Sequence, residues 1–289
     1  MIPEAWKLQL PVPPDYRELK KISPTRLDSY RRCPFTFYLC DKEVLGDKRL
    51  DDRTSDLARW EFGNLVHAAL ESWGLEGRAF DESVDRLLAE RFGDIVPEAV
   101  VAQGVEAKAR LARFAERQAR YAEEGWRVAA VEHKFELTIG HTLFFGKCDR
   151  IDCNERTGEW RVVDYKTWDE LPESVESLQL PLYCAMLEAD AAFPEAVRGR
   201  ITSAYCVLGR ERTDFTAPLG WSAVEAALGE AAELVSRLEK GIFWPPSPAQ
   251  SWRYDYGDWL FPSPEESVAS VWLADQQRRV ESLKVRLNS

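Results

Sequence analysis

The chain has 289 residues, 45% of them hydrophobic, and a formal net charge of −11 at pH 7. This length and composition allow a substantial buried core, in one large domain or two small ones. The acidic balance argues against a protein that coats nucleic acid by bulk electrostatic attraction, although it leaves room for a local basic site.

The cysteines and the hydropathy of the chain indicate its compartment. The chain has 6 cysteines without a CxxC pair, and no apolar signal segment precedes the opening residues MIPEAWKLQL. We therefore expect a reduced, cytoplasmic protein. No apolar run reaches the roughly 18 residues that a membrane span needs, so we expect no membrane partner.

The first part of the chain is predicted to be mainly helical. Prolines recur within residues 1–22, which indicates an extended surface arm. Ser23 and Pro24 form a helix-start signal, because serine caps free amides and proline is tolerated at the first helical position. Apolar residues at helical spacing follow in three further stretches, the last from Glu98 to Glu124. We expect residues 23–125 to be mainly helical.

After Gly125 the pattern changes to that of strands. The stretches WRVAAVEHKFELTI, HTLFFGKCDRIDC and EWRVVDYKT are rich in β-branched and aromatic residues and are separated by turn-forming residues. They predict three sequential antiparallel strands. A helix at about 176–192 and a further strand, RITSAYCVLG, come next, so residues 126–215 should form a sheet core.

The C-terminal part, residues 216–289, is predicted to contain helices at about 222–240 and 264–286. An aromatic and proline-rich loop lies between them. We find no internal repeat. The whole chain is therefore interpreted as one α/β domain with a helical N-terminal elaboration and C-terminal helices.

Two charged residues in the strand WRVVDYKTW are unexpected in a buried sheet. Side chains alternate along a strand, so Asp164 and Lys166 share one face while Val163 and Tyr165 point to the other. Taken alone, such a pair is more often a surface ion pair than a functional site.

A second carboxylate is expected beside this pair. Asp149 lies at the exit of the preceding strand, in GKCDRID, and would neighbour Asp164 if the two strands form a hairpin. Two converging carboxylates repel each other unless a cation lies between them, and oxygen ligands favour Mg²⁺ or Mn²⁺.

Two helical pairs flank these strands. Gln179 and Tyr183 share one helix face, which we expect to face the charged cluster; alternatively, Tyr183 is core and Gln179 is surface. His67 and Glu71 lie one turn apart in FGNLVHAALE, where His67 is either a core residue or a ligand.

Three other polar residues are interpreted as structural. The strand period places Asp152 on the face opposite to Asp149, as a turn residue. His133 and His141 have no evident partners.

The order of these pieces is more specific than any one of them: a helical HxxxE, a strand with GxxD, then DYK, then QxxxY. Together with the opening SPTRLDSYRRCPFTFYL, this order resembles the PD-(D/E)XK nuclease superfamily, in particular its RecB-like branch, over roughly residues 22 to 262. The resemblance implies a restriction-endonuclease-like core, with a mixed β-sheet in α-β-β-β-α-β order. Residues 1–289 are then interpreted as a single nuclease domain.

The resemblance also implies individual roles. The groups that would bind Mg²⁺ or Mn²⁺ are His67, Asp149, Asp164 and the main-chain carbonyl of Tyr165, and we expect these side chains to converge on one point. Lys166 would approach the attacking water and the scissile phosphate. Gln179 and Tyr183 would hold the strand or position Lys166, and Glu71 would orient His67.

These features predict a metal-dependent DNA nuclease, an exonuclease or end-processing enzyme of DNA repair, recombination or defence. Its partners would be DNA ends or single strands and a helicase or another repair or defence protein. The alternatives are a noncatalytic DNA-end or partner-binding module of a helicase–nuclease complex, and a metal enzyme acting on another phosphate ester. A noncatalytic module should lack Asp149, Asp164 or Lys166, and all three are present, which favours the enzyme.

Two further expectations concern the ends of the chain. Basic residues around the first helix form either a local DNA contact or an ordinary solvated face; they are Lys20, Lys21, Arg26, Arg31 and Arg32. AddB-type relatives hold an iron–sulfur cluster with one cysteine in the opening motif and three near the C-terminus. Cys33 occupies the first place, but the tail FWPPSPAQSWRYDYGDWLF has no cysteine. Since four thiolates are needed, we expect no iron–sulfur cluster, Cys33 as a buried thiol, and the aromatic tail packed near the opening helix.

Overall fold

The computed structural model describes residues 19–34, 37–38, 41, 57–93, 95–168 and 177–242. The chain forms two compact units, and the larger one comprises Lys21–Pro24 and Leu50–Ala232. Helix α1, Pro24–Arg32, belongs to the smaller unit apart from its first residue. The expectation of a single domain stays a prediction.

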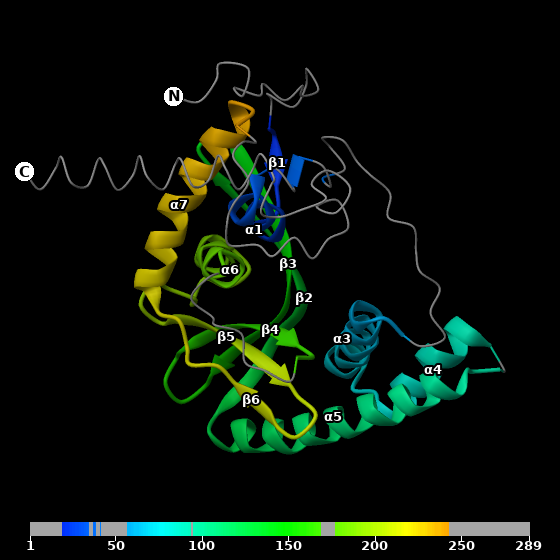
Figure 1. The fold of residues 1–289 in the computed structure, drawn as a ribbon. Coiled ribbons are helices and arrows are strands. Elements are labelled where there is room, and N and C mark those ends of the chain that lie inside the picture. The colour runs from blue at the N-terminus through cyan, green and yellow to red at the C-terminus, as the bar shows by residue number, and fades with distance from the viewer. Residues whose placement is uncertain are drawn as a thin grey trace, which may run out of the picture. The chain divides into compact units, whose positions relative to one another are not determined.

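The described strands of the larger unit form one mixed sheet (Figure 1). They are β1 (Lys21–Ile22), β2 (Trp126–Ile139), β3 (Thr142–Asn154), β4 (Trp160–Lys166), β5 (Ile201–Leu208) and β6 (Thr213–Phe215). Strands β2, β3 and β4 pair antiparallel in chain order, which confirms the predicted meander. Strand β5 then adds parallel to β4, and the unpredicted β6 pairs antiparallel with β5.

Strand β1 corrects the predicted surface arm. Its two residues pair in parallel with Leu143 and Phe144 of β3, and Ile22 is fully buried. The apolar side chain gains more from this burial than an exposed arm would offer. Residues 1–18 of the predicted arm, the predicted helix at 264–286 and the aromatic tail lie outside the described residues. Cys33 is buried, as expected, whereas the packing of the tail against it and the lack of an iron–sulfur cluster stay predictions.

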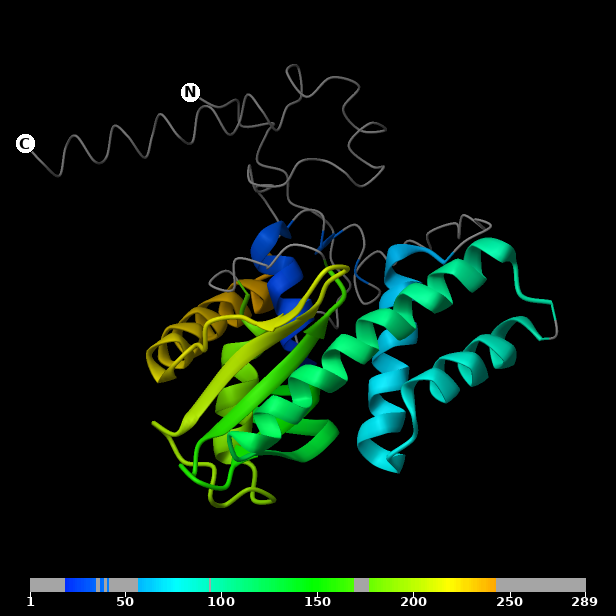
Figure 2. The ribbon, with the colours of Figure 1, turned by 90° about the horizontal axis from the view of Figure 1, so that it is seen from below.

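Helices cover both faces of the sheet (Figure 2). Helix α5 (Glu98–Glu123) packs on β2, β5 and β6, and α3 (Arg59–Glu76) and α4 (Phe80–Phe92) pack beside it. Helix α6 (Gln179–Ala189) packs on β2, β4 and β5 from the opposite face. The helix α7, Trp221–Glu239, follows β6. The predicted α-β-β-β-α-β order of elements is therefore confirmed. These elements form an α/β fold of the restriction-endonuclease type around a mixed β-sheet.

Buried apolar side chains determine how α5 and α6 pack on the sheet. Residues 180–187 of α6 are all buried, because this short apolar helix is covered on every side. On the other face, Phe114 of α5 packs edge-on against Tyr165 of β4, with ring centroids 5.7 Å apart. In the described part of the chain, no helix combines the length and apolar character needed to cross a membrane.

Candidate active site

Strands β3 and β4 part at the predicted acidic residues. Their pairing ends at Arg150 and Val163, and the next residues are Asp149 and Asp164. Beyond this point the Tyr165 N–H donates to Asp149 Oδ2 at 2.7 Å. The hairpin thus places the two carboxylates at the point where the sheet opens, which confirms the expected neighbourhood.

Asp164 is held from two sides. Lys166 Nζ lies 2.5 Å from its Oδ2, and Gln179 Nε2 donates to its Oδ1 at 3.0 Å. Burial raises the pKa of Asp164 to about 6; the Lys166 charge opposes this shift and the nearby Asp149 adds to it. Burial alone would lower the pKa of Lys166, but Asp164 outweighs it and the pKa is raised, so the amine stays protonated.

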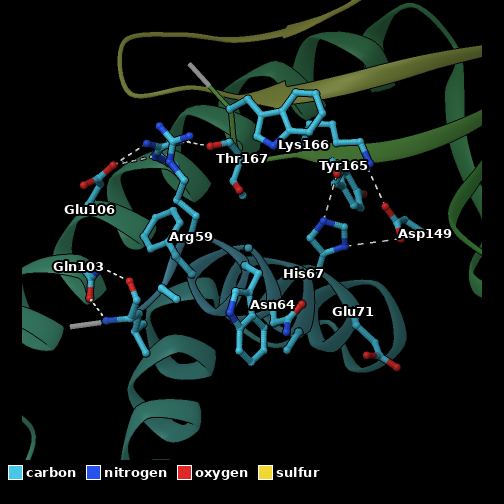
Figure 3. A pocket seen from close by; sticks show the side chains of 18 of the residues that line it. Arg59, Asn64, His67, Glu71, Gln103, Glu106, Asp149, Tyr165, Lys166 and Thr167 are labelled. Carbon is cyan, nitrogen blue, oxygen red and sulfur yellow. Dashed lines mark hydrogen bonds and ion pairs between the residues drawn. The ribbon is translucent and has the colours of Figure 1, made fainter. Parts of the chain in front are cut away.

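Helix α3 brings His67 to the same place (Figure 3). Its Nε2 lies 3.0 Å from the Tyr165 carbonyl oxygen and its Nδ1 lies 3.5 Å from Asp149 Oδ1. Burial alone would lower the pKa of His67, but Asp149 raises it overall. Figure 3 shows Glu71 pointing away from His67. The expected orienting role of Glu71 therefore belongs to Asp149 and the Tyr165 carbonyl in this structure.

The expected convergence of three side chains on one point is not met. Among the described residues, no three His, Cys, Asp or Glu side chains are already arranged to hold a metal ion. Asp149 faces His67, whereas Asp164 faces Lys166 and Gln179. The physical reason is that two neighbouring carboxylates repel, so each takes its own positive or donating partner.

The donor set still fits a hard divalent cation. It contains two carboxylates, one imidazole and one main-chain carbonyl, which suit Mg²⁺ or Mn²⁺. Adjacent ligands of an octahedral ion with bonds of about 2.1 Å lie about 3.0 Å apart. His67 Nε2 and the Tyr165 oxygen are 3.0 Å apart, but in this structure they share a hydrogen bond that the imidazole donates, and the ion would have to replace that proton.

Tyr183 reaches the cluster through Gln179. Tyr183 is buried. Burial raises the pKa of its hydroxyl to about 12, although the hydrogen bond to Gln179 opposes this shift. A Cβ on Gly146 would lie 2.6 Å from Tyr183 Cε1, so only glycine admits the ring there. The glycine of GxxD and the tyrosine of QxxxY are therefore one packing unit. Gln179 faces the cluster as expected, whereas the Tyr183 ring is buried in the core beside Phe135, as in the alternative interpretation.

Sequence reasoning missed Glu132. It lies opposite Asp149 in the β2–β3 register, between the pairs Val131–Arg150 and His133–Cys148. Its φ of 50° is strained for a glutamate, and its carboxylate forms an ion pair with Lys147. Counting residues back from the GxxD aspartate across the predicted hairpin would have found it.

Part of the cluster, namely His67, Asp149, Tyr165 and Lys166, lines a cleft of about 1390 Å³, larger than the roughly 300–1,000 Å³ of small-ligand pockets, whereas Asp164 does not line it. Its walls come from α3, α5, β2, β3, the end of β4 and the loop after β5. Arg110 of α5 donates to the carbonyls of Thr167 at 2.8 Å and Leu208 at 2.6 Å. It thereby ties the ends of β4 and β5 together behind the cleft, a link that no sequence pattern indicates.

Two interpretations of polar residues were wrong. Asp152 does face away from Asp149, but it lies within β3, fully buried, and forms ion pairs with Arg150 and Arg161 rather than a turn. Strand pairing continues past it to Cys153, so no turn forms there. His133 has a partner, because its Nε2 lies 2.7 Å from Asp190 Oδ2; the contact spans two elements that the sequence could not place together. His141 lies in the exposed β2–β3 turn.

Three of the basic residues around the first helix form ion pairs, and whether they contact DNA stays a prediction. Arg26 pairs with Asp41 at 2.6 Å, and Arg31 and Arg32 pair with Asp28 at 2.9 and 3.4 Å. These ion pairs offset much of the charge that a DNA backbone would need.

One solved structure shows a similar fold. The crystal structure of a "Putative exonuclease" from Eubacterium rectale aligns with a TM-score of 0.51 and 13% identity, over 83% of this chain and 90% of that one. The crystal structure of SSO0001 aligns with a TM-score of only 0.31 and 14% identity, over 76% of this chain and 90% of that one. No curated protein matches the sequence. The family model of the PD-(D/E)XK nuclease superfamily matches residues 21–256, and the chain therefore belongs to the PD-(D/E)XK nuclease superfamily.

Proposed function

We propose that this protein is a metal-dependent deoxyribonuclease that hydrolyses phosphodiester bonds at DNA ends. The supporting observation is the parting of β3 and β4, where Asp149 and Lys166 line a cleft and the buried Asp164 pairs with Lys166. Members of this superfamily typically use divalent metal ions such as Mg²⁺. The biological setting would be repair, recombination or defence, with a helicase or another such protein as a partner.

The groups that would hold Mg²⁺ or Mn²⁺ are His67, Asp149, Asp164 and the main-chain carbonyl of Tyr165. When bound, the ion would neutralise charge that develops on the phosphate and lower the pKa of a water molecule. The Asp149 carboxylate also accepts the Tyr165 N–H, and it thereby fixes the peptide group of this strand.

Lys166 would act on the phosphate directly. Its amine is kept protonated by Asp164, so Nζ can donate to a phosphate oxygen and stabilise the charge of the transition state. Gln179 would keep Asp164 oriented by its hydrogen bond to Oδ1, and Tyr183 would in turn hold Gln179. A rigid constellation of this kind reduces the entropy lost on reaching the transition state.

Action at ends has two supports. The structural neighbour is described as a "Putative exonuclease", and the net charge of −11 disfavours binding along the outside of a duplex. A substrate that enters a cleft by its end avoids most of that repulsion.

The test uses end-labelled linear DNA and covalently closed circular DNA, each incubated with Mg²⁺, Mn²⁺ or a chelator. We expect the linear DNA to shorten, the circle to survive, and the chelator to stop the reaction. Equal cleavage of the circle would replace end-processing by endonuclease action. Failure to cut DNA with either ion would favour the noncatalytic module, and parallel RNA and small-phosphodiester substrates separate the remaining alternative.

A further inference from the structure

The cleft extends along one stripe of α3 beyond the residues used so far. Trp60, Asn64, His67 and Glu71 all line it, and their spacing of four, three and four residues places them on one helix face. Figure 3 shows Asn64, His67 and Glu71 following one another along this helix. A rise of about 1.5 Å per residue puts Trp60 about 10 Å from His67 along the axis.

Two tryptophans are displayed in this cleft. Trp60 on α3 is 63% exposed and Trp168, just after β4, is 53% exposed, and both line the cleft. The Trp168 ring lies 5.7 Å from Lys166 Nζ. Indole rings gain free energy when they are covered. Two exposed rings from separate elements in one cleft, one of them beside Lys166, therefore favour a ligand with flat apolar faces.

The charge of the cleft also indicates that a ligand would be held largely by contacts other than ion pairs. Its lining includes basic residues, Arg59, Arg110, Lys147, Lys166 and Arg210, and acidic residues, Glu71, Glu106, Glu132 and Asp149. Glu106 pairs with both Arg110 and Arg210, and Glu132 pairs with Lys147. Such a nearly balanced lining attracts a polyanion weakly, so contacts other than charge must supply much of the affinity.

We propose that Trp60 and Trp168 stack on bases of a single-stranded DNA that runs through this cleft, an inference that rests on the proposed nuclease function. Every base has a face that can stack on an aromatic ring, so this contact tolerates any sequence. In a duplex the base faces are covered by their neighbours, so an intact duplex cannot use the two rings.

The experiment measures binding without cleavage, by fluorescence anisotropy of a labelled 12-nucleotide oligothymidine and of a blunt hairpin duplex in chelator. The variants are Trp60→Ala, Trp168→Ala and Trp60→Phe. The control is Leu75→Ala, because Leu75 is also 63% exposed on α3 but does not line the cleft. Circular dichroism confirms that each variant is folded.

We expect the wild-type protein to prefer the single strand. Each alanine variant should bind it about 5- to 150-fold more weakly, as loss of one stacked base predicts. Trp60→Phe should recover most of the affinity, Leu75→Ala should match the wild type, and the same alanine variants should raise KM for single-strand cleavage in Mg²⁺. The slope of log K against log salt should be shallow, at about −0.7 to −1.4 for one or two neutralised phosphates.

Two results would overturn this inference while leaving the nuclease intact: wild-type affinity in both alanine variants of a protein that still cuts DNA, or equally tight binding of the blunt duplex. A protein that neither binds nor cuts any DNA would overturn the proposed function and the inference with it.

Discussion

The β3–β4 hairpin carries charged clusters on both faces, and the comparison between them separates structure from chemistry. On one face, Asp152 lies between Arg150 and Arg161, and all three side chains are buried. The excess positive charge faces aromatic rings, because the Arg161 guanidinium lies 4.2 Å from the Trp126 ring centroid and 4.4 Å from that of Phe215. This cluster is sealed from substrate.

On the other face, Asp149, Asp164 and Lys166 lie where the strands part. Asp149, Lys166 and His67 line a cleft there, whereas Asp164 is buried. Burial and like charge raise the pKa of Asp164 to about 6, against the opposing Lys166 charge. Both clusters combine acidic and basic side chains of the same two strands, and neither balances its own charge. The difference teaches that access from a cleft, rather than charge within a sheet, marks the candidate site.

The largest expected effect is on the open cluster. Asp164→Asn or Lys166→Ala should reduce cleavage by at least about a thousandfold, or about 4 kcal/mol of barrier, because Asp164 would hold the metal ion and Lys166 would donate to the phosphate. Both variants break the ion pair of the buried Asp164 and should also lower stability, so the rates are compared per folded molecule. A loss below about tenfold, measured on folded protein, would mean that the site has been misplaced.

The sealed cluster should respond in the opposite way. Asp152→Ala leaves two buried guanidinium groups without their carboxylate, so the free energy of unfolding should fall by about 3–5 kcal/mol. Urea denaturation measures this loss, and cleavage per folded molecule should be nearly unchanged. Glu82→Gln, which breaks the exposed pair with Arg78, is the control and should cost less than about 1 kcal/mol. Equal losses for both variants would contradict the assignment.

A substitution of Arg110 tests whether catalysis depends on the link that this side chain makes between the ends of β4 and β5. Arg110→Lys keeps the positive charge but cannot reach the Thr167 carbonyl, the Leu208 carbonyl and Glu106 together. We expect cleavage to fall about tenfold, since a small displacement of β4 moves Lys166. Stopped-flow or steady-state rates at saturating DNA measure this effect, and an unchanged kcat would show that β4 needs no such support.

The smallest effect should come from Tyr183. Tyr183→Phe removes one hydrogen bond to Gln179 but keeps the ring beside Gly146, so cleavage should fall several-fold and stability by about 1 kcal/mol. Comparison of kcat with the unfolding midpoint separates the two. A drop in midpoint with unchanged activity per folded molecule would make Tyr183 structural.

The sequence by itself determined the features that depend on neighbours along the chain. Alternation along a strand placed Asp164 and Lys166 on one face, and a hairpin between consecutive strands brought Asp149 beside Asp164. Helix periods predicted α5 at 98–124, against Glu98–Glu123 in the structure. Local geometry is enough for each of these predictions, because no distant contact can change the period of a strand or a helix.

Only the tertiary structure decided how each charge is surrounded. Asp152 is sealed because rings from β2 and β6 close over Arg161, and Trp60 and Trp168 share a cleft because α3 packs beside the end of β4. The burial and compensation of a charge depend on residues that are remote in sequence. Local patterns therefore indicate which residues carry charge, whereas packing decides which of these charges is exposed to a substrate.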